Sequence, residues 1–408
     1  MPGRCPGKVG AVNAPFRPAR PHDGYDSSAD VYRVLGMRSV AAVLHEVGKP
    51  LEIEEIELDG PAEGEVLIRY THAGLCHSDL HVMDGDIEGW LPMVLGHEGS
   101  GVVEDVGPGV TRVAPGDHVV CSFIPSCGSC HWCATGQQAI CDMGAAIMRG
   151  HLPGPRWPIS GPGGRYGAMC MLGTFSQYGV ISQNSAVRID PDLPLDVAAL
   201  VGCGVPTGWG SAVNAAQVRP GDGVIVFGVG GIGVNAVQAA RFSGAKYVIA
   251  VDPLANKREM AERLGATHSV ATGAEAAALA RELSRGLGAD KAILTVDKMT
   301  AEVVAEAFEA TGKASTIVLT AMSGFTDQTL RLLSGVVATL YKKTIKGSLF
   351  GDCNPTSDIP RLLALYRTGD LKLDELITRR YSLEQVNEGY ADLLAGHNVR
   401  GVIEHQHG

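Results

Sequence analysis

Short stretches of alternating apolar and polar residues, separated by turn residues, occupy positions 37 to about 124. Residues 65–70 and 101–106 show the alternation, which is typical of strands that bury one face. Pro-Gly pairs at 108–109 and 115–116 mark tight turns between such strands. This part of the chain is therefore predicted to form a β-rich, partly barrel-like domain.

Continuous apolar runs replace the alternation further along the chain. Residues 223–227 form a run typical of a buried parallel strand, and a glycine-rich stretch at 228–233 follows directly. A helix is predicted at 234–242 and a second strand at 247–251. Later segments continue the pattern, with strands at 291–296 and 315–320 and a helix at 301–311. Repeated strand–helix alternation predicts a doubly wound parallel sheet.

Two stretches show no periodicity. Residues 1–36 are rich in proline, glycine and arginine, and we expect a disordered tail there. Residues 144–173 are rich in proline and glycine, and we expect a long loop that serves as a lid or a contact surface.

The end of the chain is expected to return to the first domain. Helices are predicted at 359–366 and 383–395, and a closing strand at 400–403. The fold class is therefore α/β, with a tail at 1–36, a β-rich domain at 37–204 and 348–408, and a domain built on the parallel sheet at 205–347.

Size and charge narrow the class of protein. A chain of 408 residues exceeds the size of a single core, so two domains are expected. The formal net charge of −10 argues against a nucleic-acid partner, which would be repelled. No apolar run approaches the length of a membrane-spanning helix, and the N-terminus lacks the apolar core of a secretory signal. We expect a cytoplasmic protein with no membrane association.

A thiol, an imidazole and two acids lie close together in the sequence. Cys76 is followed by Asp79, and His97 is followed by Glu98. A thiolate and an imidazole, each with a carboxylate nearby, suit a catalytic zinc ion, which takes three protein ligands and leaves one position for water or substrate. Cys203, between two glycines, is the candidate for the third ligand. The alternative for Cys203 alone is a small buried hydrophobic residue.

Four further cysteines are closely spaced. Cys127, Cys130 and Cys133 recur every third residue, and Cys141 follows. This spacing predicts a structural zinc site, because four thiolates leave no open position for a substrate. Four unrelated buried cysteines or an iron–sulfur cluster are the alternatives. Thiols in a reducing compartment are favoured over disulfides.

The glycine-rich stretch has the spacing of a dinucleotide-binding loop. Gly228 turns the chain, Gly230 lets a pyrophosphate approach the backbone, and Gly233 lets the helix pack on the strand. Asp252, at the end of the next strand, is expected to bind the adenosine ribose hydroxyls and to favour NAD over NADP. Lys257 either adds a contact to the same ribose or is a solvated helix residue.

In order and spacing, these motifs resemble one family. Residues 37–406 resemble a zinc-dependent alcohol dehydrogenase of the medium-chain dehydrogenase/reductase superfamily. The resemblance implies a GroES-like catalytic domain with a Rossmann domain, NAD as cofactor and two zinc ions per subunit. It implies that Cys76, His97 and Cys203 bind the catalytic zinc, with Asp79 and Glu98 supporting the ligands, and that the four clustered cysteines bind the structural zinc.

The resemblance also assigns roles to single residues. Ser78 matches the hydroxyl of a proton relay, and His81 matches the histidine that passes the proton to solvent. Residues at matching cofactor positions are His77, Thr207, Gly231, Ile232 and Arg400. Phe123 and Leu349 match positions in the substrate pocket.

Four stretches resemble a narrower branch, the NDMA-dependent, mycofactocin-associated alcohol dehydrogenases of actinobacteria. They are residues 122–125, 132–136, 201–204 and 347–351. Enzymes of this branch are nicotinoproteins, which keep NAD bound and pass electrons to a second acceptor. The resemblance implies mycofactocin as a redox partner, an alcohol or aldehyde as the small-molecule ligand, and a homo-oligomer, either dimer or tetramer.

The expected reaction is hydride transfer from a primary or secondary alcohol to NAD, which gives an aldehyde or ketone. One alternative is a glutathione-dependent formaldehyde dehydrogenase, but residues 142–146 offer no cation to anchor the glutathione carboxylates. Another is a non-catalytic sensor of NAD or zinc, which would have little reason to keep Ser78 and His81.

Overall fold

The computed structural model describes residues 36–322, 324 and 327–407. All of these residues belong to one compact unit. The predicted tail at 1–36 lies outside the described residues, apart from Gly36. No helix in the described part of the chain combines the length and the apolarity needed to cross a bilayer.

The first alternating segments close into a small barrel, with strand order β1-β2-β7-β8-β4. Alternate residues of these strands turn inward and form a core that includes Ala41, Val43, Ile56 and Tyr166. The strands are β1 (Met37–Leu44), β2 (Glu52–Leu58), β4 (Met93–Val94), β7 (Ile159–Gly161) and β8 (Gly164–Ala168). The expectation of an unstructured loop over 144–173 is therefore wrong, because β7 pairs with β2 and β8 pairs with β4.

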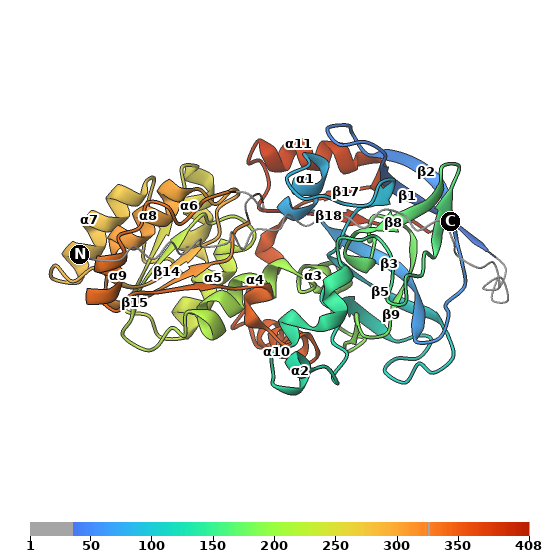
Figure 1. The fold of residues 1–408 in the computed structure, drawn as a ribbon, viewed down its shortest axis with the longest axis horizontal. Helices are drawn as coiled ribbons and strands as arrows, with labels where there is room; N and C mark the ends of the chain where they lie inside the picture. Colours follow the sequence, from blue (N-terminus) through green and yellow to red (C-terminus); the bar gives the residue numbers. More distant parts are fainter. Residues whose placement is uncertain (1–35, 323, 325–326, 408) are drawn as a thin grey trace, which may run out of the picture. The chain divides into compact units, whose positions relative to one another are not determined.

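A second sheet in the described residues carries the active-site segments. Its order is β10-β6-β5-β3-β18-β17, and β9 also pairs with β3. The last strand is antiparallel to β3, with Val402 opposite Gly74, so the C-terminal segment joins the N-terminal sheet (Figure 1). The strands are β3 (Glu65–Gly74), β5 (Gly99–Val106), β6 (His118–Cys121), β9 (Tyr178–Ser182), β10 (Ala186–Arg188), β17 (Ile377–Tyr381) and β18 (Arg400–Glu404).

The apolar runs form a parallel sheet in the order β13-β12-β11-β14-β15-β16. Its strands are β11 (Gly223–Phe227), β12 (Tyr247–Val251), β13 (His268–Val270), β14 (Ala289–Leu294), β15 (Thr311–Leu319) and β16 (Thr344–Gly347). Helices on both faces explain why these runs are apolar throughout (Figure 1). The helices are α5 (Gly233–Phe242), α6 (Ala255–Arg263), α7 (Gly273–Leu283), α8 (Ala301–Ala310) and α9 (Gly335–Leu340).

The side chains of β11 divide between the two faces of this sheet. Val224 and Val226 belong to one core together with residues of α5 and α6. Ile225 and Phe227 belong to another core together with residues of α7 and α8. The sheet is therefore doubly wound, and the predicted α/β fold class, a GroES-like β domain with a Rossmann sheet, is confirmed.

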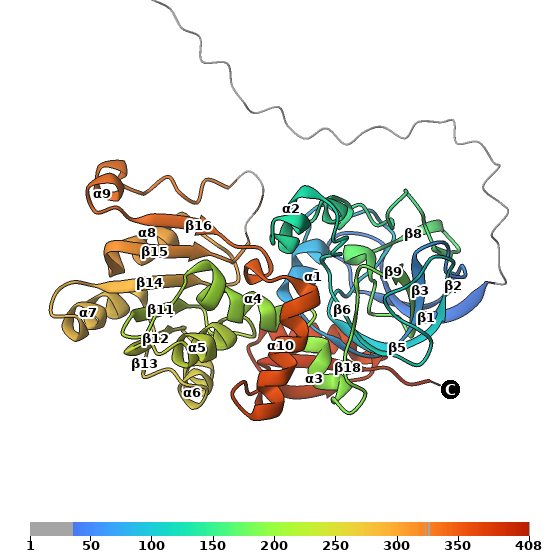
Figure 2. The ribbon, with the colours of Figure 1, turned by 90° about the horizontal axis from the view of Figure 1, so that it is seen from below.

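Short helices link and flank the sheets. They are α1 (His77–Met83), α2 (His131–Ala134), α3 (Leu195–Leu200), α4 (Gly204–Gly210), α10 (Pro355–Thr368) and α11 (Val386–Leu394). The predicted helix at 359–366 is longer in the structure, because Pro355 suits the first turn and Gly369, with φ of 79°, ends the helix. α10 packs against α4, which begins directly after Cys203 (Figure 2).

Candidate active site

Three chain segments bring the predicted catalytic ligands together. Cys76 precedes α1, His97 lies between β4 and β5, and Cys203 precedes α4. One potential ligand atom from each of Cys76, His97, Glu98 and Cys203 lies within 4.8 Å of the others, and all four residues are buried. The structure thus assembles the predicted set and places Glu98 beside it.

Asp79 fixes the positions of two of these residues. One carboxylate oxygen, Oδ2, accepts from the backbone amide of Cys76 at 3.3 Å. The other, Oδ1, lies 3.1 Å from Nδ1 of His97 and accepts from the amide of Gly96 at 3.1 Å. Because Asp79 occupies Nδ1, the His97 ring turns Nε2 toward the two thiols.

Nε2 of His97 and the thiols of Cys76 and Cys203 form a set of donor atoms that fits a metal ion. Nε2 of His97 is buried and has no hydrogen-bond partner among the described residues, an arrangement that is costly unless a ligand is bound. The contact with Cys203 outweighs burial and, with the nearby His97 ring, keeps the pKa of the Cys76 thiol well below its ordinary value. An imidazole nitrogen beside two thiols is a donor set for zinc.

A buried ion pair connects this cluster to the glycine loop. Arg400 pairs with Glu98, and the other carboxylate oxygen of Glu98 accepts from the amide of Gly204 at 3.0 Å. A Cβ atom at Gly231 would collide with the Arg400 side chain, so the guanidinium stem lies directly against the loop. Arg400 Nε is buried without a partner in the described part of the chain.

The glycine loop has room on one side and close packing on the other. A side chain at Gly230 would meet nothing, whereas a Cβ at Gly233 would collide with the carbonyl of Gly228. Asp252 is buried and its carboxylate accepts from the amides of Val229, at 3.1 Å, and Leu254, at 3.0 Å. Open space at Gly230 is what close approach of a dinucleotide pyrophosphate requires.

The other predicted cofactor residues lie on α1, α4 and α6 and at the start of α5. Thr207 is buried in α4 and donates to the carbonyl of Cys203 at 2.7 Å. Ile232 caps α5, and Lys257 lies half-buried in α6. Nε2 of His77 lies 3.6 Å from Asp297, and burial lowers the pKa of His77.

The predicted relay residues lie on α1. The Ser78 hydroxyl oxygen is 3.7 Å from the sulfur of Cys76. His81 is buried in the last turn, with Nδ1 at 3.1 Å from Oδ2 of Asp86. The sequence alone did not identify Asp86, because an acid five positions after a histidine is a weak signal.

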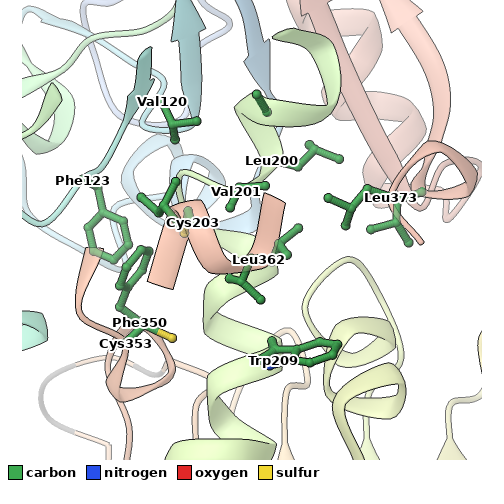
Figure 3. Packing of buried hydrophobic residues seen from close by; sticks show 14 of the residues in the cluster. Val120, Phe123, Leu200, Val201, Cys203, Trp209, Phe350, Cys353, Leu362 and Leu373 are labelled. Atoms are coloured by element: carbon green, nitrogen blue, oxygen red, sulfur yellow. The ribbon is translucent and has the colours of Figure 1, made fainter. Parts of the chain in front are cut away.

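Aromatic rings flank the cluster. Phe123 meets His97 edge to face at 6.0 Å between ring centroids, and Phe350 meets Phe123 in the same way at 5.2 Å (Figure 3). Leu349, the predicted pocket residue, is 42% exposed, whereas Phe350 is 1% exposed. Phe350 was missed, although it stands next to Leu349 in the stretch that carried the resemblance.

The four clustered cysteines form a separate site. One sulfur from each of Cys127, Cys130, Cys133 and Cys141 lies within 4.8 Å of the others. The amide of Cys130 donates to the sulfur of Cys127 at 3.3 Å, and the amide of Cys133 donates to the sulfur of Cys130 at 3.4 Å. Burial opposes ionisation, but the amides of Cys130 and Ser129 lower the pKa of Cys127 to about 6. Thiolates held by backbone amides are typical of a closed zinc site.

Comparison with known proteins agrees with both parts of the fold. Residues 62–191 match the family model of the alcohol dehydrogenase GroES-like domain, and residues 231–368 match that of zinc-binding dehydrogenases. The chain is 59% identical over 369 residues to an NDMA-dependent alcohol dehydrogenase of Amycolatopsis methanolica, an alignment that covers 90% of this chain and 99% of the relative.

Solved structures show the same architecture. An alcohol dehydrogenase zinc-binding domain protein from Burkholderia ambifaria has a TM-score of 0.86 and 33% identity to this chain. The match covers 91% of this chain and 100% of the Burkholderia chain. A benzyl alcohol dehydrogenase from Acinetobacter calcoaceticus has a TM-score of 0.85 and 29% identity, with the same coverage.

Proposed function

The chain belongs to the zinc-containing alcohol dehydrogenases of the medium-chain dehydrogenase/reductase superfamily, and we propose that it transfers a hydride from a primary or secondary alcohol to NAD. The products are an aldehyde or ketone and the reduced cofactor. The observation that carries the proposal is the buried Nε2 of His97, which lies close to two thiols and has no hydrogen-bond partner among the described residues. The neighbouring Glu98 pairs with Arg400, whose side chain lies against the glycine loop.

Cys76, His97 and Cys203 are the residues proposed to hold the catalytic zinc. Glu98 is also within reach, but its oxygens already serve Arg400 and the amide of Gly204. A zinc ion held by these three residues would have one coordination position left for a substrate. When bound, zinc supplies a Lewis acid and NAD supplies a hydride acceptor.

The chain's own residues orient the ligands and move the proton. Asp79 holds His97 through Nδ1, so that Nε2 faces the metal position. Ser78, beside Cys76, is proposed to take the proton of the substrate hydroxyl, and His81 on the same helix is proposed to pass it to solvent. Phe123 and Phe350 are proposed to form an apolar wall that excludes water, and Leu349 is a candidate for the pocket mouth.

Residues around the glycine loop are proposed to hold NAD. Asp252 places a buried negative charge at the end of β12, which disfavours a 2′-phosphate and so favours NAD over NADP. Lys257 is a candidate for the same ribose, His77 and Arg400 for the phosphates, and Thr207 and Ile232 for the nicotinamide. Gly228, Gly230, Gly231 and Gly233 shape the loop.

We further propose that the enzyme is a nicotinoprotein. The 59% identical relative is named for its dependence on NDMA, which supports a tightly held NAD that a second acceptor reoxidises, with mycofactocin as the proposed redox partner. The second zinc ion of each subunit belongs at the four clustered cysteines, and the assembly is proposed to be a homo-oligomer.

The test combines analysis of the purified protein with an assay. We expect its ultraviolet spectrum and mass analysis to reveal bound nicotinamide, and we expect octanol oxidation with NDMA as acceptor. Oxidation of formaldehyde that requires glutathione, without octanol oxidation, would support the glutathione-dependent alternative instead. A protein that oxidises neither substrate, although it contains zinc and NAD, would overturn the proposed activity.

A further inference from the structure

A tyrosine near the end of the chain has a buried hydroxyl without a partner. Tyr390 lies in α11 and is 2% exposed. Its hydroxyl oxygen makes no hydrogen bond with any of the described residues. A buried hydroxyl without a partner is costly, so native proteins nearly always supply one. The surroundings of Tyr390 therefore need to contain a group that can accept its hydrogen.

Packing contacts on two sides place Tyr390 beside the assembled site. Gly389, its neighbour in α11, packs directly against Leu75, since a Cβ at Gly389 would collide with the Leu75 side chain. On the other side, the ring of Tyr390 lies 6.2 Å from that of Phe175, measured between centroids. Phe175 in turn packs on Gly96, where a Cβ would collide with its ring and its backbone. Leu75 and Gly96 directly precede the proposed thiol and imidazole ligands, so α11 is packed against both ligand segments.

The acceptor nearest to this hydroxyl is the carboxylate of Asp79. The hydroxyl of Tyr390 faces that carboxylate and the backbone of Cys76. The side chain of Asp79 is itself fully buried, so no solvent separates the two groups. Burial, followed by the charge of Asp79, raises the pKa of Tyr390 well above its ordinary value. The hydroxyl therefore keeps its hydrogen and can act as a donor.

The carboxylate of Asp79 has one acceptor position left. A carboxylate offers about four such positions, two on each oxygen. Oδ1 accepts from the amide of Gly96 and pairs with Nδ1 of His97, each at 3.1 Å. Oδ2 accepts from the amide of Cys76 at 3.3 Å and has no second donor among the described residues. The hydroxyl of Tyr390 lacks an acceptor and Oδ2 lacks a donor, so each can satisfy the other.

We propose that Tyr390 is a positioning residue for zinc binding at the assembled site, because its hydroxyl donates to Oδ2 of Asp79 and fills the last acceptor position of that carboxylate. A buried carboxylate keeps its charge and its orientation best when every position is filled. Asp79 in that state holds the His97 ring through Nδ1. The inference rests on the proposed function for the presence of zinc at Cys76, His97 and Cys203.

Competition with a chelator measures the effect of Tyr390→Phe on zinc affinity without any turnover. We expect affinity at the assembled site to fall roughly 10-fold, the lower end of the 10–100-fold that loss of an outer partner of a metal ligand costs. The zinc at the four clustered cysteines is the internal reference and should be held as in the wild type. Tyr381→Phe is the matched control, because it removes a buried hydroxyl that donates to Asp392 instead, and it should leave both affinities unchanged.

A double-mutant cycle separates positioning from packing. If the hydroxyl acts through the charge of Asp79, Tyr390→Phe should matter little once Asp79→Asn has removed that charge. We expect zinc affinity to change by less than about 2-fold in that background, which is the scatter of independent effects. A loss that came only from altered packing of α11 would be the same in both backgrounds. Equal losses would therefore overturn the inference.

The outcomes separate this inference from the proposed function. A wild type that binds zinc only at the four clustered cysteines would overturn the proposed function, and the inference with it. A wild type that binds both zinc ions, while Tyr390→Phe keeps the wild-type affinity at the assembled site, would overturn the inference alone. A crystal structure of the zinc-loaded wild type is an independent check. The hydroxyl should lie within about 3 Å of Oδ2 of Asp79, and a hydroxyl that donates to another group would contradict the positioning role.

Discussion

The two metal-type clusters contain the same kind of donor but differ in how they are built. The four cysteines at 127–141 come from one short segment, and backbone amides of that segment support their sulfurs. Cys76, His97 and Cys203 come from three separate segments, and the side-chain carboxylate of Asp79 positions Cys76 and His97. A local cluster whose donors are all sulfurs can close around an ion and serve the fold, whereas an assembled set with three ligands can leave a position for chemistry.

The largest expected effect is on the assembled site. Replacing Cys76 or His97 with alanine should remove one zinc ion per chain and lower alcohol oxidation by more than about 100-fold, since disturbing the residues that merely support such ligands already costs 10–100-fold. Zinc analysis and an octanol assay measure the two effects. Normal activity in a variant that has lost only this zinc would refute the ligand assignment.

The local cluster should respond in stability instead. Cys130→Ser is expected to remove the other zinc ion and to lower the unfolding temperature by about 5 °C or more, because metal binding there is coupled to folding of the segment. Molecules that remain folded should keep near-normal activity per catalytic zinc. The comparison of the two sites breaks down if Cys130→Ser abolishes catalysis while the melting temperature is unchanged.

The variant Asp79→Asn tests whether the carboxylate of Asp79 strengthens zinc binding at the assembled site. Asp79→Asn keeps the shape but loses the charge, and we expect zinc affinity at the assembled site to fall by roughly 10–100-fold. Competition with a chelator measures this affinity, and the zinc at the four cysteines is the internal reference. Equal weakening at both sites would point to general unfolding rather than to support of His97.

The smallest expected effect is on the pH dependence of stability, and it involves His405, which is linked through Thr174 to Glu98. His405 donates through Nε2 to the carbonyl of Thr174, whose hydroxyl donates to the carbonyl of Glu98. Burial lowers the pKa of His405 from 6.5 to about 3. Below pH 6.5 the unfolded chain therefore binds a proton that the folded chain does not, and stability falls by up to about 1.4 kcal/mol per pH unit until the pH nears 3.

Denaturant unfolding of the wild type and His405→Gln at pH 7 and pH 5 measures this contribution. The variant should lose less stability between the two pH values than the wild type does. His72 and His77, whose pKa values burial also lowers, contribute equally to both proteins. Identical pH dependence in the two proteins would show that His405 is not the group responsible.

Local patterns could be predicted from the sequence. The spacing of Cys127, Cys130 and Cys133 depends on neighbours in the chain, and so does the strand–loop–helix unit around Gly228. Asp252 follows from the same unit. These features are predictable because the residues that interact lie within one or two elements of one another.

Contacts between residues far apart in the chain were harder to predict from the sequence. β7 and β8 are short strands in a segment rich in proline and glycine. They pair with each other, and β2 and β4, which lie far away in the sequence, complete their pairing. Glu98 and Arg400 were both predicted as site residues, but their direct contact spans 302 positions and no local pattern signals it. The contact of His81 with Asp86 was missed although it is local, because an acid five positions after a histidine is a weak signal.

The most direct test is a crystal structure of the purified protein with anomalous scattering at the zinc edge. We predict two peaks per chain, one of them bonded to the sulfurs of Cys76 and Cys203 and to Nε2 of His97, while Glu98 stays paired with Arg400. A chain that is active in alcohol oxidation but has no zinc peak at this position would contradict the account.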